Sequence, residues 1–310
     1  MSKNTVATVR VLLGLSLSLL LADGSMAGAW GSDYFPNYEL TNQDGQTLHF
    51  YDDVIKGKVV AINFMYTSCE DVCPVETAKL REVQRRLGDR IGDDVFLYSI
   101  SIDPEHDTPE VLKAYAKQFH VGPGWQFLTG KQSEIEELQK RLGLYIQSVQ
   151  DIDPLDHNVS LVLGNEATGR WLKRTPYEST DVLTNLLGYG LHRNRRQPGA
   201  ASYANAAKLT DFDRGEYLFR TRCASCHTMG GGNEIGPDLI NVAAVRDRVW
   251  LKRWIKEPDV MLAEGDPLGT QLVKQFGDLP MPNLSLNDVD LEALVGFLER
   301  VERGQLQSAQ

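Results

Sequence analysis

Residues 59–74 read VVAINFMYTSCEDVCP, and this stretch decides the fold of the first half of the chain. Its first seven residues are almost continuously apolar, and polar residues follow from Thr67. A short apolar run of this kind predicts a central strand in a sheet that is covered on both faces. Cys69 and Cys73 are therefore expected in the loop that leaves the strand and enters the next helix.

The flanking segments predict an alternation of strands and helices. In residues 39–48 an Asp-Gly pair is expected to form the turn of a hairpin. Leu80, Val83 and Leu87 have the spacing of a helix that packs one face on the sheet. Further strands are expected at residues 95–102, 125–128, 158–163 and 170–174, and further helices at 108–119, 133–142 and 179–189. The alternation predicts a mixed α/β domain.

The pattern changes near residue 194. Residues 194–208 have no apolar periodicity and carry five alanines with Pro198 and Gly199, which is typical of a linker. Beyond them the pattern predicts helices alone, with Ser285 as the N-cap of the last one. These helices are expected at residues 212–221, 247–256 and 288–303. The second domain is therefore predicted to be all-α.

The first 29 residues have the pattern of a secretory signal. Lys3 and Arg10 are followed by a 12-residue apolar run at 11–22 and by small residues up to Ala29. A membrane-spanning helix needs about 20 apolar residues, so cleavage is favoured over an anchor. We expect an exported, periplasmic protein, associated with the membrane and facing the periplasm only if the signal is retained.

The predicted organisation is a signal peptide at 1–29, an α/β domain at 30–192, a linker at 193–208 and an all-α domain at 209–305. A chain of 310 residues suits two domains. Its 32 Lys and Arg residues against 42 Asp and Glu residues give a net charge of -10. Because phosphate binding needs a basic face, nucleic acid is not expected as a partner.

The motif at Cys223-Ala224-Ser225-Cys226-His227 has the Cys-x-x-Cys-His spacing of covalent haem c attachment. In such a motif two thiols form thioethers with the two vinyl groups, and the histidine lies beneath the iron. A zinc site would need further Cys or His ligands at suitable spacing, which this half of the sequence lacks. We therefore interpret Cys223, Cys226 and His227 as a haem site.

A sixth iron ligand has to come from the opposite face of the haem. Met229 is too close to His227 in the sequence to reach that face. Met281 is favoured over Met261, because the flanking residues Pro280 and Pro282 stiffen its loop. Either methionine could instead fill a core.

Residues 209–303 resemble class I cytochromes c. The resemblance is carried by the segments 215–219 (GEYLF) and 236–239 (GPDL) and by Met281-Pro282 ahead of the final helix. It implies that Pro237 lies beside His227 and that the first and last helices of the domain cross. His/Met ligation raises the iron potential, which suits electron transfer.

The other cysteine pair, Cys69 and Cys73, is separated by three residues. In an exported protein four cysteines usually form structural disulfides, but here each close pair lies inside a motif and is interpreted as a site. A helix N-terminus is expected to lower the pKa of a thiol. Thiolates select Cu(I), and an added imidazole lets a site hold Cu(II) as well. Of five histidines outside the haem domain, His157 is our choice of third ligand.

Residues 31–190 resemble the thioredoxin-like copper proteins of the Sco/SenC family. The resemblance is carried by the segments 66–74, 101–109 and Asp156-His157. It implies that Cys69, Cys73 and His157 bind copper destined for the copper-site subunit of cytochrome c oxidase or another acceptor. One departure is Glu70, where the family usually has proline, and an acid there would raise the thiol pKa or repel an acidic partner.

Three functions follow from these motifs. The first is copper delivery or copper reduction, with the haem exchanging single electrons with the copper site and with other redox proteins. The second is an enzyme, a thiol-disulfide oxidoreductase or a thiol peroxidase coupled to the haem. The third is an electron-transfer cytochrome with a docking domain. A haem moves one electron, which matches Cu(II)/Cu(I), whereas a disulfide takes two.

Overall fold

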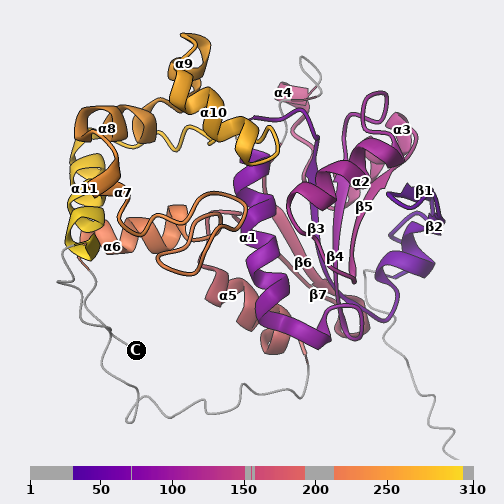
Figure 1. Ribbon diagram of the computed structural model, residues 1–310. Helices are drawn as coiled ribbons and strands as arrows, with labels where there is room; N and C mark the ends of the chain where they lie inside the picture. Colours follow the sequence, from indigo (N-terminus) through magenta and orange to yellow (C-terminus); the bar gives the residue numbers. More distant parts are fainter. Residues whose placement is uncertain (1–30, 71, 151–154, 156–157, 193–212, 303–310) are drawn as a thin grey trace, which may run out of the picture.

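The computed structural model describes residues 31–70, 72–150, 155, 158–192 and 213–302 (Figure 1). The predicted signal peptide, the whole of the predicted linker and His157 lie outside these residues. Within them, no helix is both long enough and apolar enough to cross a membrane. The structure has two parts, a sheet with helices on both faces and a purely helical part.

A seven-stranded mixed sheet forms the first part, in the order β2-β1-β5-β4-β3-β6-β7. The three central strands β5, β4 and β3 are parallel to one another, and all other pairs of neighbouring strands are antiparallel. The strands are β1 (Glu39–Asn42), β2 (Thr47–His49), β3 (Val59–Met65), β4 (Val95–Ser101), β5 (Trp125–Thr129), β6 (Leu161–Asn165) and β7 (Arg170–Arg174).

Helices cover both faces of this sheet, as expected from the apolar run of β3. They are α1 (Val72–Leu87), α2 (Pro109–Gln118), α3 (Gln132–Arg141), α4 (Gln147–Gln150) and α5 (Thr180–Asn185), with short 3-10 or π turns at Phe50–Ile55, Gly88–Arg90, Glu166–Thr168 and Leu186–Gly190. Alternate residues of β3 enter two separate cores: Ala61 packs with residues of α1, α2 and α5, and Ile62 packs with residues of α3.

Most local predictions for the first domain are confirmed. The predicted hairpin has its turn at Gly45, whose φ is 77°. Leu80, Val83 and Leu87 lie on one face of α1, and all three are buried. Thr108 caps α2 by accepting from the backbone N–H of Val111. One boundary is wrong, because β6 begins at Leu161 rather than at residue 158.

The second part is all-α in the described residues 213–302, as predicted. Its helices are α6 (Arg214–Leu218) with a π turn at Phe219–Cys223, α7 (Val242–Val245), α8 (Arg248–Lys256), α9 (Pro258–Ala263), α10 (Pro267–Gln275) and α11 (Asp288–Glu302).

Three of these helices, α7, α9 and α10, are absent from the sequence prediction. The signals for α9 and α10 were Pro258 and Pro267, which occupy the first helical turn, where a missing N–H does no harm. Ser285 is not the N-cap of α11. Asn287 takes that role, since its Oδ1 accepts from the backbone N–H of Asp290 at 2.9 Å.

Helices α6 and α11 pack closely at Gly215. A Cβ atom there would clash with the carbonyl oxygen of Ala293 and lie 2.7 Å from Cβ of Phe297. Ion pairs Arg214–Asp290 and Arg300–Asp213 join the two helices at the edge of this contact. The crossing of α6 and α11, which the cytochrome resemblance implies, therefore requires a residue without a side chain at position 215.

We predict that Gly215→Ala lowers the free energy of unfolding by about 1–3 kcal/mol, because the added methyl group overpacks the contact. Chemical denaturation of the full chain measures the effect. Gly296→Ala in α11 is the matched control, since its Cβ would meet only the flexible end of Arg300 at 3.5 Å. Alanine favours a helix over glycine by about 0.5–1 kcal/mol. Equal effects of the two substitutions would contradict the packing explanation.

Candidate functional site

Cys69 and Cys73 lie at the connection between β3 and α1. Cys69 is half-buried in the loop, and its backbone N–H donates to the carbonyl of Tyr66 at 3.3 Å. Cys73 lies in the first turn of α1 and is fully buried. The two thiols are close enough to share a hydrogen bond. The predicted meeting of the two sulfurs at one helix start is thus what the structure shows.

The expected lowering of the thiol pKa is wrong for Cys73. The hydrogen bond with Cys69 and the burial of the sulfur both raise the pKa of Cys73. They outweigh the positive end of α1, because a second anion beside Cys69 is costly where water is excluded. Glu70 is exposed and is not among the causes of this shift. A cation bound between the two sulfurs would compensate the negative charge of the two thiolates.

A buried carboxylate, Asp107, holds the loop that carries Cys69. It accepts hydrogen bonds from the backbone N–H of Thr67 at 3.0 Å, from the Thr67 hydroxyl at 2.5 Å and from the Ser101 hydroxyl at 2.6 Å. Its side chain has no exposed surface, and His106 Nδ1 lies 3.0 Å from Oδ1. Sequence reasoning quoted Asp107 only as part of a motif and did not find this anchoring role.

Glu76 is a second buried acid near the thiol pair, one helical turn after Cys73. Asn63 Nδ2 donates to its Oε2 at 2.8 Å, while Oε1 has no hydrogen-bond partner among the described residues. Burial raises the pKa of Glu76 to about 8. The side chain is therefore mostly protonated at neutral pH. A single Glu on a helix gives no sequence signal for such burial.

The third predicted copper ligand, His157, lies outside the described residues, as does Asp156. In the described part of the chain no group of three or more His, Cys, Asp or Glu side chains is placed to hold a metal ion. His157 stays a prediction.

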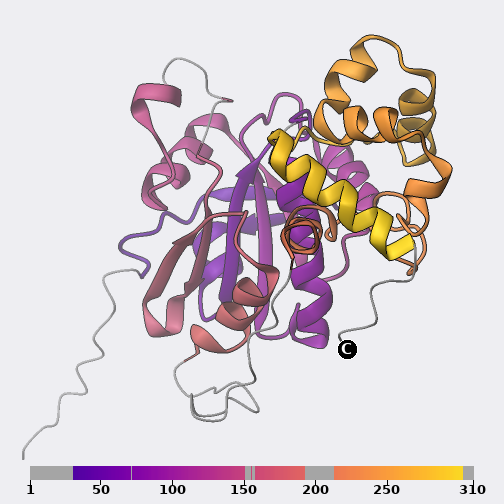
Figure 2. The same ribbon diagram turned by 90° about the vertical axis from the view of Figure 1, so that its left-hand side faces the viewer.

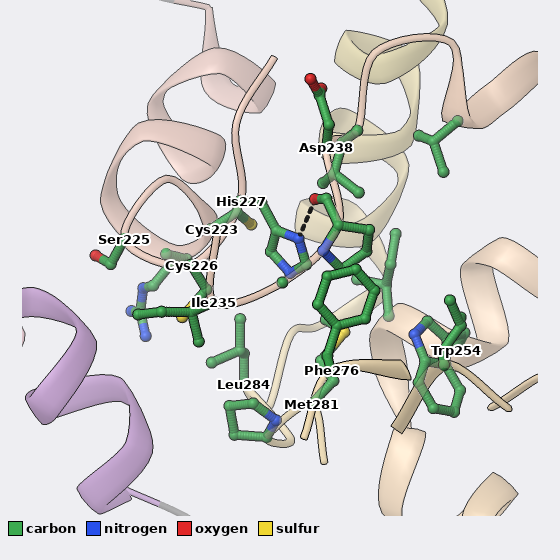
Figure 3. A pocket seen from close by; sticks show the side chains of 18 of the residues that line it. Cys223, Ser225, Cys226, His227, Ile235, Asp238, Trp254, Phe276, Met281 and Leu284 are labelled. Atoms are coloured by element: carbon green, nitrogen blue, oxygen red, sulfur yellow. Dashed lines mark hydrogen bonds between the residues drawn. The ribbon is translucent and has the colours of Figure 1, made fainter. Parts of the chain in front are cut away.

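Cys223, Cys226, His227 and Met281 line one pocket of about 210 Å³ (Figure 3). Cys223 ends the π turn that continues α6, and Cys226 and His227 follow it, whereas Met281 comes from the segment between α10 and α11. Aromatic and aliphatic side chains make up most of the remaining wall. The structure thus brings together all four residues that the sequence assigns to one site.

The ring of His227 is fixed from two sides. Its Nδ1 donates to the carbonyl oxygen of Pro237 at 2.8 Å, which leaves Nε2 unprotonated and available as a ligand (Figure 3). Burial lowers the pKa of His227, so the neutral form is favoured. On the other side, a Cβ at Gly236 would lie 2.5 Å from Cε1 of the ring. The pair Gly236-Pro237 therefore sets the position of the imidazole.

The three methionines considered as iron ligands differ in their positions relative to the pocket. Met261 is buried in α9 and is not part of the pocket wall, whereas Met281 is. Met229 packs on the core of the helical domain. Of the two candidates for a sixth ligand, only Met281 shares a pocket with His227.

The residues of this pocket fit a haem c. Burial raises the pKa of Cys223 and of Cys226 to about 12, so both sulfurs stay uncharged. Thioethers are also uncharged and suit the same burial. The apolar walls match a flat macrocycle, and a neutral imidazole with a free Nε2 is the form that binds iron.

The first domain also contributes to this pocket. Pro74 and Val75 of α1 and Phe119 after α2 line it beside Cys223 and Cys226. Pro74 directly follows Cys73, so the thiol pair and the haem pocket lie on adjacent residues of one helical turn. Sequence reasoning did not anticipate this contact.

A thioredoxin-like α/β domain with a thiol pair at the start of α1, joined to a helical domain with a haem c pocket, defines a two-domain redox protein. The chain belongs to the SCO1/SenC family, which it matches over residues 28–184. Residues 212–302 match cytochrome c, so a cytochrome c domain follows the SCO1/SenC domain.

The chain is similar to several known proteins. It is 32% identical to the SCO1 protein homolog of Bacillus subtilis, over 57% of this chain and 96% of that protein. The copper-bound structure of Bradyrhizobium japonicum ScoI is 31% identical, with a TM-score of 0.41, over 49% of this chain and 95% of that one. The cytochrome c domain of the pp3183 protein from Pseudomonas putida is 47% identical, with a TM-score of 0.27, over 29% of this chain and 88% of that one.

We predict that Gly236→Ala displaces the His227 ring and disturbs the iron environment of the haem-loaded protein. Visible absorption spectra of both oxidation states measure the effect, with a shift from a six-coordinate low-spin spectrum as the expected result. The control is Gly231→Ala in the same loop, whose Cβ would meet only the side chain of Thr228, at 3.1–3.4 Å. An unchanged spectrum in Gly236→Ala would count against the role of Gly236.

Proposed function

We propose that this chain is an exported copper-binding redox protein that delivers copper during cytochrome c oxidase assembly. Its haem c domain exchanges single electrons with the copper site. The observation that carries the proposal is the pair of thiols, Cys69 and Cys73, which share a hydrogen bond at the start of α1. The copper-bound relative ScoI supports copper as the ion.

In this proposal Cys69, Cys73 and His157 hold the copper ion, which is cargo. Two soft sulfurs favour Cu(I), and the imidazole extends binding to Cu(II). Because the pKa of Cys73 is raised in the metal-free pair, copper binding releases protons from the thiols. Asp107 keeps the Thr67 end of the loop in place while this occurs.

In the second domain Cys223 and Cys226 would form the thioethers, and His227 and Met281 would bind the iron. A haem held in this way supplies one electron at a time by cycling between Fe(II) and Fe(III). The Pro237 carbonyl and Gly236 orient His227 for this role. The apolar wall keeps water from the iron and so favours a high potential.

One-electron exchange favours copper over a disulfide as the haem's partner. Reduction of Cu(II) to Cu(I) consumes the single electron that oxidation of Fe(II) to Fe(III) releases. Reducing a disulfide takes two electrons. Protein dithiol couples also lie at roughly -120 to -270 mV, below the range that His/Met ligation favours, so reduced haem is a poor donor to a disulfide.

The enzymatic alternatives have less support. A thiol peroxidase or thiol-disulfide oxidoreductase needs a stabilised thiolate near a cationic group. In the structure the pKa of Cys73 is raised, and the residue after Cys69 is the acid Glu70. An electron-transfer cytochrome with a docking domain would use the same haem pocket but would leave the thiol pair without a role.

The partners follow from the proposed chemistry. The acceptor is the copper-site subunit of cytochrome c oxidase or another copper acceptor, and other redox proteins exchange electrons with the haem. Export is supported by the pattern at residues 1–29, with the periplasm as the compartment.

We predict one copper ion per protein, and loss of most of it in His157→Ala after washing with a mild chelator. One of three ligands is then missing, and the remaining two thiols hold Cu(II) poorly. Metal analysis of the full chain gives the result. His49→Ala is the control, because His49 lies in β2 and pairs with Asp53. Copper retention in His157→Ala equal to that in the control would contradict the ligand assignment.

We predict that reduced haem reduces Cu(II) within the same molecule. Stopped-flow spectra of the reduced, Cu(II)-loaded chain should show haem oxidation at a rate that does not depend on protein concentration. The copper-free chain is the control and should stay reduced. A rate proportional to protein concentration, or no copper-dependent oxidation, would contradict intramolecular exchange.

A further inference from the structure

Helix α1 is covered on more sides than a surface helix normally is. Every residue from Cys73 to Leu80 is buried, including Glu76, Thr77 and Lys79. A helix that packs only on a sheet leaves its opposite face to water and places its polar residues there. Glu76 and Thr77 face the first domain itself, where they hydrogen-bond with Asn63 and Tyr115. The opposite side of the helix, with Pro74, Val75 and Lys79, is covered by the cytochrome domain (Figures 1 and 2).

An apolar contact joins the two domains at this helix. Ile235 of the cytochrome domain is 8% exposed and belongs to the same core cluster as Cys73 and the apolar residues of α1. Cys226 and Leu279 pack on this cluster from the cytochrome side, and Cys69 packs on it from the other. The apolar cluster is therefore continuous between the two cysteine motifs.

Polar contacts lie around the apolar patch that Ile235, Cys226 and Leu279 form with α1. Gln118 Nε2 donates to the carbonyl oxygen of Gly277 at 2.8 Å. The guanidinium of Arg222 lies 5.6 Å from the ring centroid of Tyr177, a cation–π contact between the domains. These contacts orient the cytochrome domain, since each joins a residue of the first domain to a residue of the cytochrome domain.

Charge acts in both directions where α1 meets the cytochrome domain: Arg85 is attracted to Glu234, whereas Lys79 is repelled by Arg222. Burial, and then the nearby positive charge of Arg222, lower the pKa of Lys79 to about 8. Two cations therefore oppose each other across the contact, with the Lys79 ammonium donating to the carbonyl oxygen of Glu178 at 3.2 Å. The apolar patch has to outweigh this repulsion, so it is the part of the interface to test.

We propose that the first turn of α1 is the outer wall of the haem pocket. Pro74 and Val75, with Phe119, close the haem edge at Cys226 to water and to external redox agents and leave the copper domain as its neighbour there. This inference rests on the proposed attachment of haem at Cys223 and Cys226. It does not require that copper binds or that electrons pass between the sites.

The test uses copper-free, haem-loaded full chain with Val75→Asp and Val75→Lys. Both changes place a charge in the apolar patch, with opposite signs. An uncharged quinone oxidises the reduced haem, and the second-order rate constant is measured by stopped flow. We expect a severalfold increase in both variants, because opening the wall exposes the haem edge. Small-angle scattering should show a larger radius of gyration in both.

Two controls complete the test. Val182→Asp adds the same charge at an exposed position of α5 and should change neither quantity. Val75→Leu keeps an apolar side chain in the patch and should retain the slow oxidation. Unchanged oxidation rates in both charged variants, or an increase with only one sign of charge, would overturn the proposed wall. Because copper is absent, this result is independent of the copper-loss and electron-exchange measurements.

Discussion

The structure depends on the burial of one helical turn, residues 73–75 at the start of α1. This turn follows a strand that is covered on both faces, so the sheet determines where it begins. Cys73 forms the thiol pair with Cys69, while Pro74 and Val75 line the haem pocket. A single element thereby contributes residues to both candidate sites.

Burial of α1 also explains the unusual acid–base properties around it. Glu76 and Lys79 carry opposite formal charges at neutral pH in water, yet burial shifts the pKa of each to about 8, toward its neutral form. The same loss of water raises the pKa of Cys73. Removing charge from water is costly unless a partner compensates it. A copper cation at the thiols and an apolar macrocycle in the pocket are both compatible with such a dry environment.

The two cysteine motifs differ in what their surroundings allow. Cys69 and Cys73 share a hydrogen bond beside a loop that Asp107 anchors. Cys223 and Cys226 line an apolar pocket beside a histidine whose free nitrogen is set by Pro237. The first arrangement suits a cargo that enters and leaves, and the second suits a permanent group.

The amino-acid sequence alone determined the local elements and the motif spacings. The apolar run of β3, the Asp-Gly turn at Gly45, the helical spacing of Leu80, Val83 and Leu87 and the Cys-x-x-Cys-His motif all depend on neighbours within a few residues, and the structure contains each where it was predicted. The N-cap of α11 was wrong at Ser285 because two residues, Ser285 and Asn287, offered similar local signals, and only the path of the loop chose between them.

Only the tertiary structure decided which distant residues share a site. The anchoring of the Cys69 loop by Asp107 and the wall formed by Pro74, Val75 and Phe119 both join segments that are far apart in the chain. Such contacts arise from packing between whole elements, and no local pattern encodes them. The raised pKa of Cys73 has the same origin, because burial by other elements outweighs the local effect of the helix end.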